Sequence, residues 1–67
     1  MHQDLSRREH DVVALVAEGK TNAEIALETG LSRSTVKDYV ANACHKAGVT
    51  NRVALATWYA EHRGDSA

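Results

Sequence analysis

The basic side chains of this 67-residue chain gather in one segment, although the formal net charge is −1. Residues 1–31 carry three Lys or Arg against six Asp or Glu, and residues 53–67 have a net charge of −1. Residues 32–52 carry four basic side chains and one acidic one, so this segment has a net charge of +3. A one-sided cationic surface of this kind is typical of proteins that bind a polyanion such as nucleic acid. Chance clustering on a solvated helix would give the same pattern.

The other residues that could do chemistry favour neither a metal site nor catalysis. The four histidines and the single cysteine lack the spacing that brings metal ligands together. Cys44 and His45 are neighbours, so on a helix their side chains point about 100° apart and cannot act as a pair. We interpret Cys44 as a small hydrophobic residue near the core. With no phosphate-binding glycine loop and too little chain for a pocket of about 300 Å³, we expect no enzyme, no catalytic residue, no metal and no cofactor.

The length of the chain allows a single domain, residues 1–67, with a core at about residues 5–62. So short a chain builds a thin core, and one cysteine cannot form an internal disulfide. Helix packing and association with a second copy remain as sources of stability. The polar start and the short apolar run Val12–Ala17 predict neither a secretory signal nor a membrane span. We expect a cytoplasmic location.

Capping residues and glycines divide the chain into four helices. Helix starts are indicated by two S/T-x-x-E capping boxes and two further N-caps: Ser6 with Glu9, Thr21 with Glu24, Ser32, and Thr50 or Asn51. Helix ends are indicated by glycines, which adopt left-handed conformations cheaply: Gly19, Gly30, Gly48 and Gly64. These signals predict an all-α four-helix bundle with helices at about 7–18, 22–29, 33–47 and 51–62, and frayed ends at 1–4 and 64–67.

The second and third predicted helices are joined tightly, as in a helix-turn-helix. Their connection is Thr29–Ser32, in which Gly30 supplies the positive φ that the turn needs. Apolar residues recur at helical spacing along the third helix and should face the core: Val36, Val40, Ala43 and Ala47. The fourth helix is apolar on more than one side, which predicts a partner surface beside the core surface.

A set of motifs at fixed spacing runs from Leu5 to about Ala60. In chain order the motifs are Leu5-Ser6-x-Arg8-Glu9, Leu15-Val16-Ala17-Glu18-Gly19-x-Thr21-Asn22-x-Glu24-Ile25-Ala26, Leu31-Ser32-x-Ser34-Thr35-Val36-Lys37, Asn42, Lys46, Gly48-Val49 and Arg52. This set resembles the LuxR-type (GerE-like, NarL-like) helix-turn-helix family of bacterial response regulators and quorum-sensing regulators. The resemblance implies that the third helix recognises DNA and that the fourth forms a dimer. It also implies an interhelical ion pair between Glu9 and Arg52.

The chain departs from the pattern of that family at four positions. Tyr39 stands where the family usually has a histidine. Smaller residues stand where the family has bulkier aliphatic ones: Thr29, Ala43 and Ala47. A seam of small residues along the third helix should bring the neighbouring helices closer or leave voids.

The resemblance places Lys37, Asp38 and Ala41 against base edges, because a helix in the major groove presents its first exposed residues there. Lys37 could donate to guanine, Asp38 could accept from cytosine, and Ala41 could touch a thymine methyl group. Phosphate contacts are expected at the starts of the second and third helices, where free N–H groups favour anions, and at one peripheral lysine: Thr21, Asn22, Ser32, Arg33, Ser34, Thr35 and Lys46. Capping explains Thr21 and Ser32 equally well, and solvent exposure explains Lys46.

We therefore expect sequence-specific binding of double-stranded DNA by a bacterial transcription regulator, as a homodimer on a pseudo-palindromic site. The expected partners are DNA, a second copy of the chain and RNA polymerase, with no membrane. The predicted dimer interface on the fourth helix is Val53, Thr57 and Trp58. The alternative is a protein-interaction module, or an anti-activator, of the same fold that has lost DNA binding. The sequence fits both a stand-alone regulator and the output domain of a longer protein.

Overall fold

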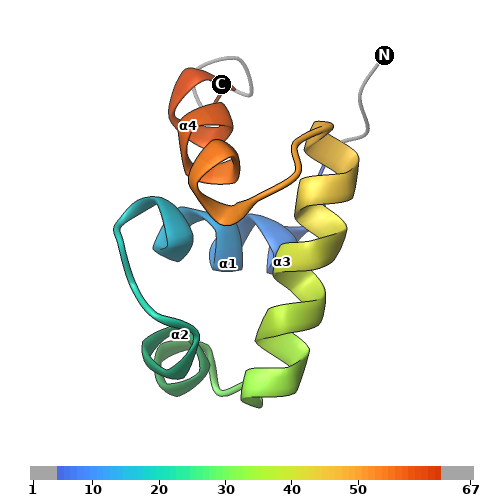
Figure 1. The fold of residues 1–67 in the computed structure, drawn as a ribbon. Coiled ribbons are helices and arrows are strands. Elements are labelled where there is room, and N and C mark those ends of the chain that lie inside the picture. The colour runs from blue at the N-terminus through green and yellow to red at the C-terminus, as the bar shows by residue number, and fades with distance from the viewer. Residues whose placement is uncertain (1–4, 63–67) are drawn as a thin grey trace.

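Four helices make up the described part of the chain, residues 5–62 of a computed structural model (Figure 1). They are α1 (Arg7–Ala17), α2 (Asn22–Thr29), α3 (Arg33–Ala47) and α4 (Arg52–His62), and no strand occurs among these residues. The all-α prediction is confirmed, and each predicted helix boundary lies within one residue of the observed one. The predicted stop at Gly64 and the predicted frayed ends lie outside the described residues.

Each helix begins where a side chain accepts a hydrogen bond from an otherwise unpaired backbone N–H group. Both predicted capping boxes are present: Ser6 with Glu9, and Thr21 with Glu24, each with N···O distances of 2.8 and 3.2 Å. Ser32 Oγ accepts from the Thr35 N–H group at 3.1 Å. For α4 the cap is Asn51 rather than Thr50, because Asn51 Oδ1 accepts from the N–H group of Ala54 at 2.8 Å.

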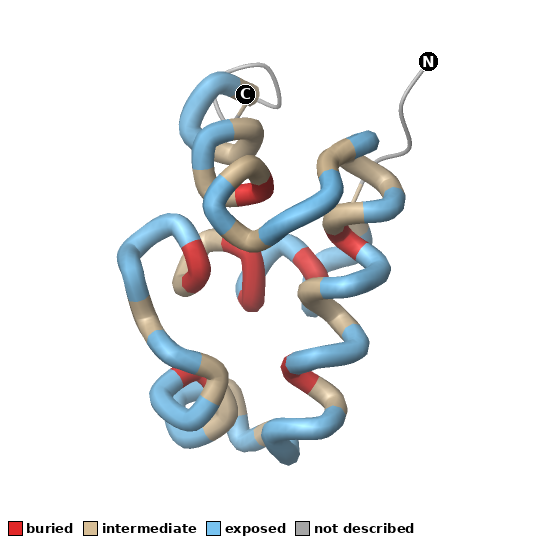
Figure 2. The backbone as a smooth tube through the Cα atoms, in the orientation of Figure 1, coloured by how far each residue is buried: buried red, intermediate tan, exposed pale blue. Residues whose placement is uncertain are grey.

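The core forms around one face of α1, against which the other three helices pack. Val12, Val13 and Val16 of α1 are buried, and each of the other helices adds buried residues: Ile25, Val36, Ala43 and Leu55. These buried segments face the interior in Figure 2. Ala43 is fully buried and Ala47 packs against the core, so the small residues of α3 lie where the helices meet.

The turn between α2 and α3 is fixed by Gly30 and by Thr29. Gly30 has φ +75°, a left-handed conformation that is strained for other residues, and its N–H group donates to the carbonyl of Ala26. Thr29 Oγ1 donates to the carbonyl of Ile25 at 2.7 Å and accepts from the N–H group of Leu31 at 3.4 Å. The threonine that replaces a bulkier aliphatic residue therefore joins the last turn of α2 to the start of the connection.

Replacing Leu55 by alanine should remove much of the stability of the domain. Leu55 is fully buried between α4 and the rest of the core, and Leu→Ala changes at such sites cost about 2–5 kcal/mol. Leu27→Ala is the matched control, because Leu27 is 87% exposed, and its effect should stay within about 0.5 kcal/mol. Urea unfolding followed by circular dichroism measures both. A comparable loss in the two variants would contradict the core as described.

Candidate nucleic-acid interface

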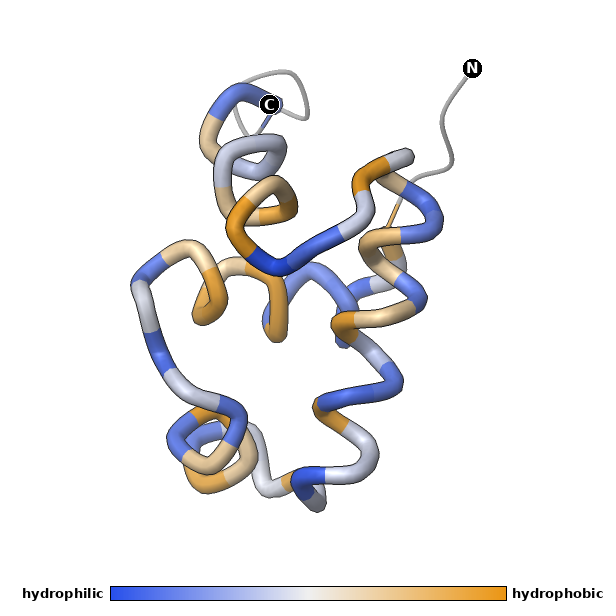
Figure 3. Tube along the Cα trace, viewed as in Figure 1, coloured by the Kyte–Doolittle hydropathy of each residue, from blue (hydrophilic) through white to orange (hydrophobic). Residues whose placement is uncertain are grey.

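The outer face of α3 is a continuous exposed stripe. Its exposed residues recur three and four positions apart and so share one side of the helix: Arg33, Ser34, Lys37, Asp38, Ala41, Asn42 and His45. On the opposite side Val36 and Ala43 are buried against the other helices. Figure 3 shows the same division, with the hydrophobic segments of α3 facing the bundle and hydrophilic ones on its outer side. The predicted base-reading residues Lys37, Asp38 and Ala41 therefore lie together on the exposed face.

The charged side chains of this face are not engaged within the domain. Among residues 5–62, Arg33, Lys37 and Asp38 have no ion pair or side-chain hydrogen bond. Their charges are therefore available to a ligand. Ser34, on the same face, likewise has a hydroxyl group without a partner in the described part of the chain.

At the start of α3, two of the predicted phosphate contacts bind each other. Ser32 Oγ donates to Thr35 Oγ1 at 2.9 Å while it accepts from the Thr35 N–H group. The single hydroxyl hydrogen of Ser32 is thus used inside the domain, and that of Thr35 remains available to an acceptor. Ser32 therefore acts as the N-cap of α3, which is one of the two roles that the sequence allowed for it.

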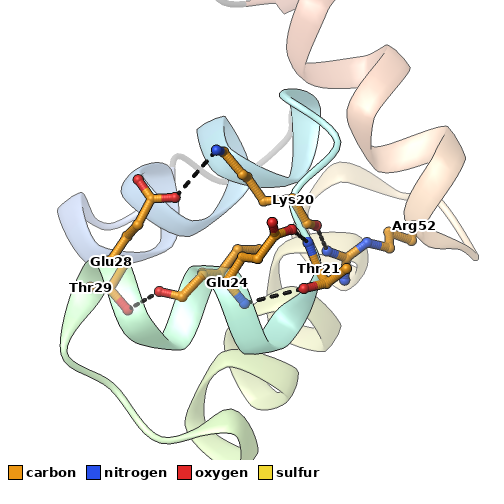
Figure 4. Close-up of polar contacts among 7 residues, drawn as sticks. Lys20, Thr21, Glu24, Glu28, Thr29 and Arg52 are labelled. Atoms are coloured by element: carbon orange, nitrogen blue, oxygen red, sulfur yellow. Dashed lines mark hydrogen bonds and ion pairs between the residues drawn. The ribbon is translucent and has the colours of Figure 1, made fainter.

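At the start of α2, Thr21 and Glu24 satisfy each other, and Figure 4 shows both hydrogen bonds of this capping box. The hydrogen bonds from Thr21 hold the pKa of the Glu24 carboxyl below its usual value. The N–H groups of Asn22 and Ala23 have no acceptor among the described residues. This helix start therefore keeps two backbone donors for an anion.

The side chain of Asn22 is held by Arg52, the first residue of α4. Arg52 Nη1 donates to Asn22 Oδ1, and Arg52 Nη2 donates to the carbonyl of Lys20, each at 2.5 Å. Figure 4 shows the guanidinium reaching the loop before α2. Lys20 in turn lies 3.6 Å from a carboxylate oxygen of Glu28. Sequence reasoning gave Asn22 no structural role, and the structure supplies one.

The predicted ion pair between Glu9 and Arg52 is wrong. Glu9 pairs instead with Lys46 of α3, with a distance of 2.7 Å between Lys46 Nζ and Glu9 Oε1. Glu9 is only 4% exposed, so the carboxylate needs a charged partner, and the long side chain of Lys46 reaches it. Lys46, a predicted phosphate contact, is thus committed to α1.

The pKa of the Glu9 carboxyl reflects this environment. Burial raises it, but hydrogen bonds from the side chain of Lys46 and from Ser6 outweigh burial and leave the pKa below its usual value.

Burial also raises the pKa of the Cys44 thiol, which donates weakly to the Asn51 carbonyl at 3.7 Å. A raised pKa keeps this thiol protonated at neutral pH and unreactive.

The outer side of α4 carries the residues predicted to form a dimer. Val53 is 76% exposed, Thr57 is exposed, and Trp58 is half-buried against the core. Trp58 stacks on His62, with ring centroids 5.0 Å apart and an interplanar angle of 20°. Val53 and Thr57 are four positions apart and share one side of α4, whereas Trp58 is five positions from Val53 and lies farther round the helix, toward the core.

Residues 5–62 contain neither a metal-binding cluster nor a membrane-spanning helix. No group of three or more His, Cys, Asp or Glu residues within them could hold a metal ion. None of the described helices is long and apolar enough to cross a membrane.

A short α2, a turn built on glycine and a longer α3 with an exposed polar face define a helix-turn-helix domain. Residues 3–59 match the GerE family, described as "Bacterial regulatory proteins, luxR family". The chain belongs to this family, which is one of regulatory proteins and not of enzymes.

Similar proteins include the probable transcriptional regulatory protein SgaR of Hyphomicrobium methylovorum, 46% identical over 75% of this chain and 24% of SgaR. The transcriptional regulatory protein LiaR of Bacillus subtilis is 39% identical over 85% of this chain and 27% of LiaR. The crystal structure of the response regulator ChrA, from a heme-sensing two-component system, superposes with a TM-score of 0.85 at 32% identity. It covers 94% of this chain and 31% of ChrA. The chain thus spans about a quarter of the length of SgaR and LiaR.

Glu9→Gln should make the stability of the domain less dependent on pH. Because the pKa of Glu9 is lowered in the folded state, its stabilisation is present above the unfolded pKa of about 4.3 and is lost as pH falls through the folded pKa. At pH 7 the variant should be less stable by about 1–3 kcal/mol.

That difference should hold down to about pH 5 and shrink below about pH 4. Urea unfolding between pH 3 and 7 measures it. Glu18→Gln is the control, since Glu18 is exposed and its side chain has no partner within the described residues. A wild-type advantage that stays constant to pH 3 would rule out the ionised Glu9 carboxylate as its source.

Proposed function

We propose that this domain binds double-stranded DNA sequence-specifically, as part of a bacterial transcription regulator that works in the cytoplasm, with α3 in the major groove. The observation that carries the proposal is the outer face of α3, where Arg33 and Lys37 have no partner within the described chain. An exposed helix with uncommitted cations near its start fits the way helix-turn-helix proteins enter a major groove. Membership of a family of bacterial regulatory proteins supports the same function.

On this proposal the base edges are read by Lys37, Asp38 and Ala41. Lys37 donates to guanine O6 and N7, and the Ala41 methyl group contacts a thymine methyl group. Asp38 accepts a hydrogen bond from the amino group of cytosine, and this bond offsets the repulsion between its carboxylate and the DNA phosphates. All three are exposed on one face, as this assignment requires.

The phosphates are held at the starts of α2 and α3. Arg33 and Ser34 supply uncommitted side-chain donors, and Thr35 keeps one hydroxyl hydrogen. At α2 the donors are the backbone N–H groups and the side chain of Asn22. Lys46 and Ser32 contribute less than the sequence indicated, because the charge of Lys46 and the hydroxyl hydrogen of Ser32 are already used within the domain. Thr21 only accepts from the N–H group of Glu24 and keeps its hydroxyl hydrogen for a phosphate.

Two copies associate through α4 and place their α3 helices in successive major grooves. Such a dimer binds half-sites whose centres lie about 10 base pairs apart, or a multiple of it, on a roughly palindromic site. The exposed Val53 supports this surface, because it is an apolar residue on a side of α4 that it shares with the exposed Thr57.

Lys37→Ala should weaken binding to the preferred site by about 1–3 kcal/mol and relax the choice of base at one position per half-site. The site is first obtained by selecting bound duplexes from a random pool, and affinity is then measured by fluorescence anisotropy across a series of salt concentrations.

Arg7→Ala is the charge-matched control, because it removes the positive charge of an exposed residue at the start of α1 without touching the proposed interface. It should leave base preference unchanged. Wild-type binding without a salt dependence, or no binding at all, would favour the protein-interaction alternative, since phosphate neutralisation makes DNA affinity fall steeply with salt.

Val53→Glu should raise the dissociation constant of the dimer, because it places a charge in the apolar contact between the two α4 helices. Sedimentation equilibrium should show a shift toward monomer, and the affinity for a two-half-site duplex should fall in parallel. Leu27→Glu makes a similar change at an exposed apolar residue of α2 and should leave the monomer–dimer equilibrium as it is. Equal shifts in both variants would argue against α4 as the interface.

A further inference from the structure

Three structural elements meet at the guanidinium of Arg52. It belongs to the first turn of α4, and its two terminal nitrogens bind the Lys20 carbonyl, in the loop after α1, and Asn22 Oδ1, at the first position of α2. Arginine has only donors, so the partner atom on Asn22 must be the amide oxygen and not the amide nitrogen. The contact therefore fixes which end of the Asn22 amide points toward Arg52.

The other end of the amide is left for a ligand. No described residue accepts a hydrogen bond from Asn22 Nδ2, yet no buried polar side-chain atom in residues 5–62 lacks a partner. Nδ2 of the half-buried Asn22 therefore reaches solvent. It does so at a helix start that also presents the free N–H groups of Asn22 and Ala23.

We propose that Arg52 is a positioning residue for DNA binding, which turns the Asn22 amide so that its amino group joins the two backbone N–H groups of α2 in holding one phosphate. This inference rests on the proposed function and deepens it. Without the guanidinium, the amide could rotate and present its oxygen, an acceptor that a phosphate repels. Arg52 thus contributes a positive charge that stays inside the domain and acts on DNA through its neighbour.

A double-mutant cycle in DNA affinity separates this role from a merely structural one. Asn22→Ala should weaken binding by about tenfold or more, as expected for loss of a hydrogen bond to a charged group. Arg52→Lys keeps the charge but loses the planar fork that reaches both acceptors, and it should weaken binding by at least about threefold. In the Asn22→Ala background, Arg52→Lys should change affinity by less than about twofold, because its target is gone.

The cycle also distinguishes this inference from the proposed function. An effect of Arg52→Lys that is the same in both backgrounds would overturn the positioning role and leave DNA binding by the domain intact. Absence of salt-dependent binding in the wild-type chain would instead remove the proposed function, and this inference with it.

Asn22→Asp tests the same idea should Arg52→Lys fail to fold. The carboxylate keeps an acceptor for Arg52, so the melting temperature should not fall, but the amino donor is replaced by an oxygen and affinity should fall at least as far as in Asn22→Ala. Asn51→Asp is the matched control, since Asn51 also lies at a helix start and its Oδ1 also accepts a hydrogen bond, and the affinity of this variant should stay within about twofold of wild type. A DNA affinity of Asn22→Asp equal to that of the wild type, or an equal loss of affinity in Asn51→Asp, would overturn the proposal.

Discussion

The valine face of α1 is the surface on which the other helices are placed. Val12, Val13 and Val16 are the only buried apolar side chains that α1 provides among the described residues, and α2, α3 and α4 all pack against this helix. A core this thin removes little apolar area from water per residue, so packing alone leaves the helix angles weakly determined. Polar contacts at the edges of the core therefore do more to fix the relative positions of the helices than they would in a bigger domain.

Two of those contacts use basic residues that the charge distribution had suggested for DNA. Lys46 joins α3 to the buried Glu9 of α1, and Arg52 joins α4 to the loop before α2. Arg52 bridges α4 and the start of α2, two helices that do not otherwise pack against each other, whereas Lys46 adds a polar contact to the packed pair α1 and α3. The four basic residues of segment 32–52 therefore fall into two groups. Arg33 and Lys37 remain exposed on α3, while the other two connect helices within the bundle.

The elements could be predicted because their signals are local. Capping boxes, N-cap residues and glycines act within four residues of a helix end, so Ser6, Thr21 and Gly30 could be interpreted without tertiary knowledge. The exposed face of α3 followed from helical periodicity once Val36 was assigned to the core. The family resemblance correctly supplied the helix-turn-helix class.

The partners of the long side chains could not be predicted from the same signals. Lys46 and Glu9 are 37 residues apart, and Arg52 and Asn22 are 30 apart, so which cation meets which acceptor depends on helix packing. The resemblance did imply an interhelical ion pair for Glu9, but it gave Arg52 as the partner, whereas Lys46 is the residue that reaches the carboxylate. The hydrogen bond from the Thr29 hydroxyl to a carbonyl of its own helix could not be predicted either, because a threonine near a helix end fits several local arrangements.

The small number of uncommitted cations bears on how the domain would discriminate between DNA sites. Non-specific affinity grows with the number of phosphates neutralised, and α3 of one copy offers only Arg33 and Lys37 within the described chain, with Asp38 beside them. A carboxylate on the binding face is repelled by every phosphate but satisfied by a cytosine amino group, so it penalises wrong sites more than the right one. On the proposed function, weak attraction to the DNA backbone would then raise the ratio of specific to non-specific affinity and lower the affinity of each copy. On the same proposal, a second copy joined through α4 would restore affinity without changing that ratio at each half-site, and an exposed apolar residue such as Val53 on α4 would then contribute to recognition by α3.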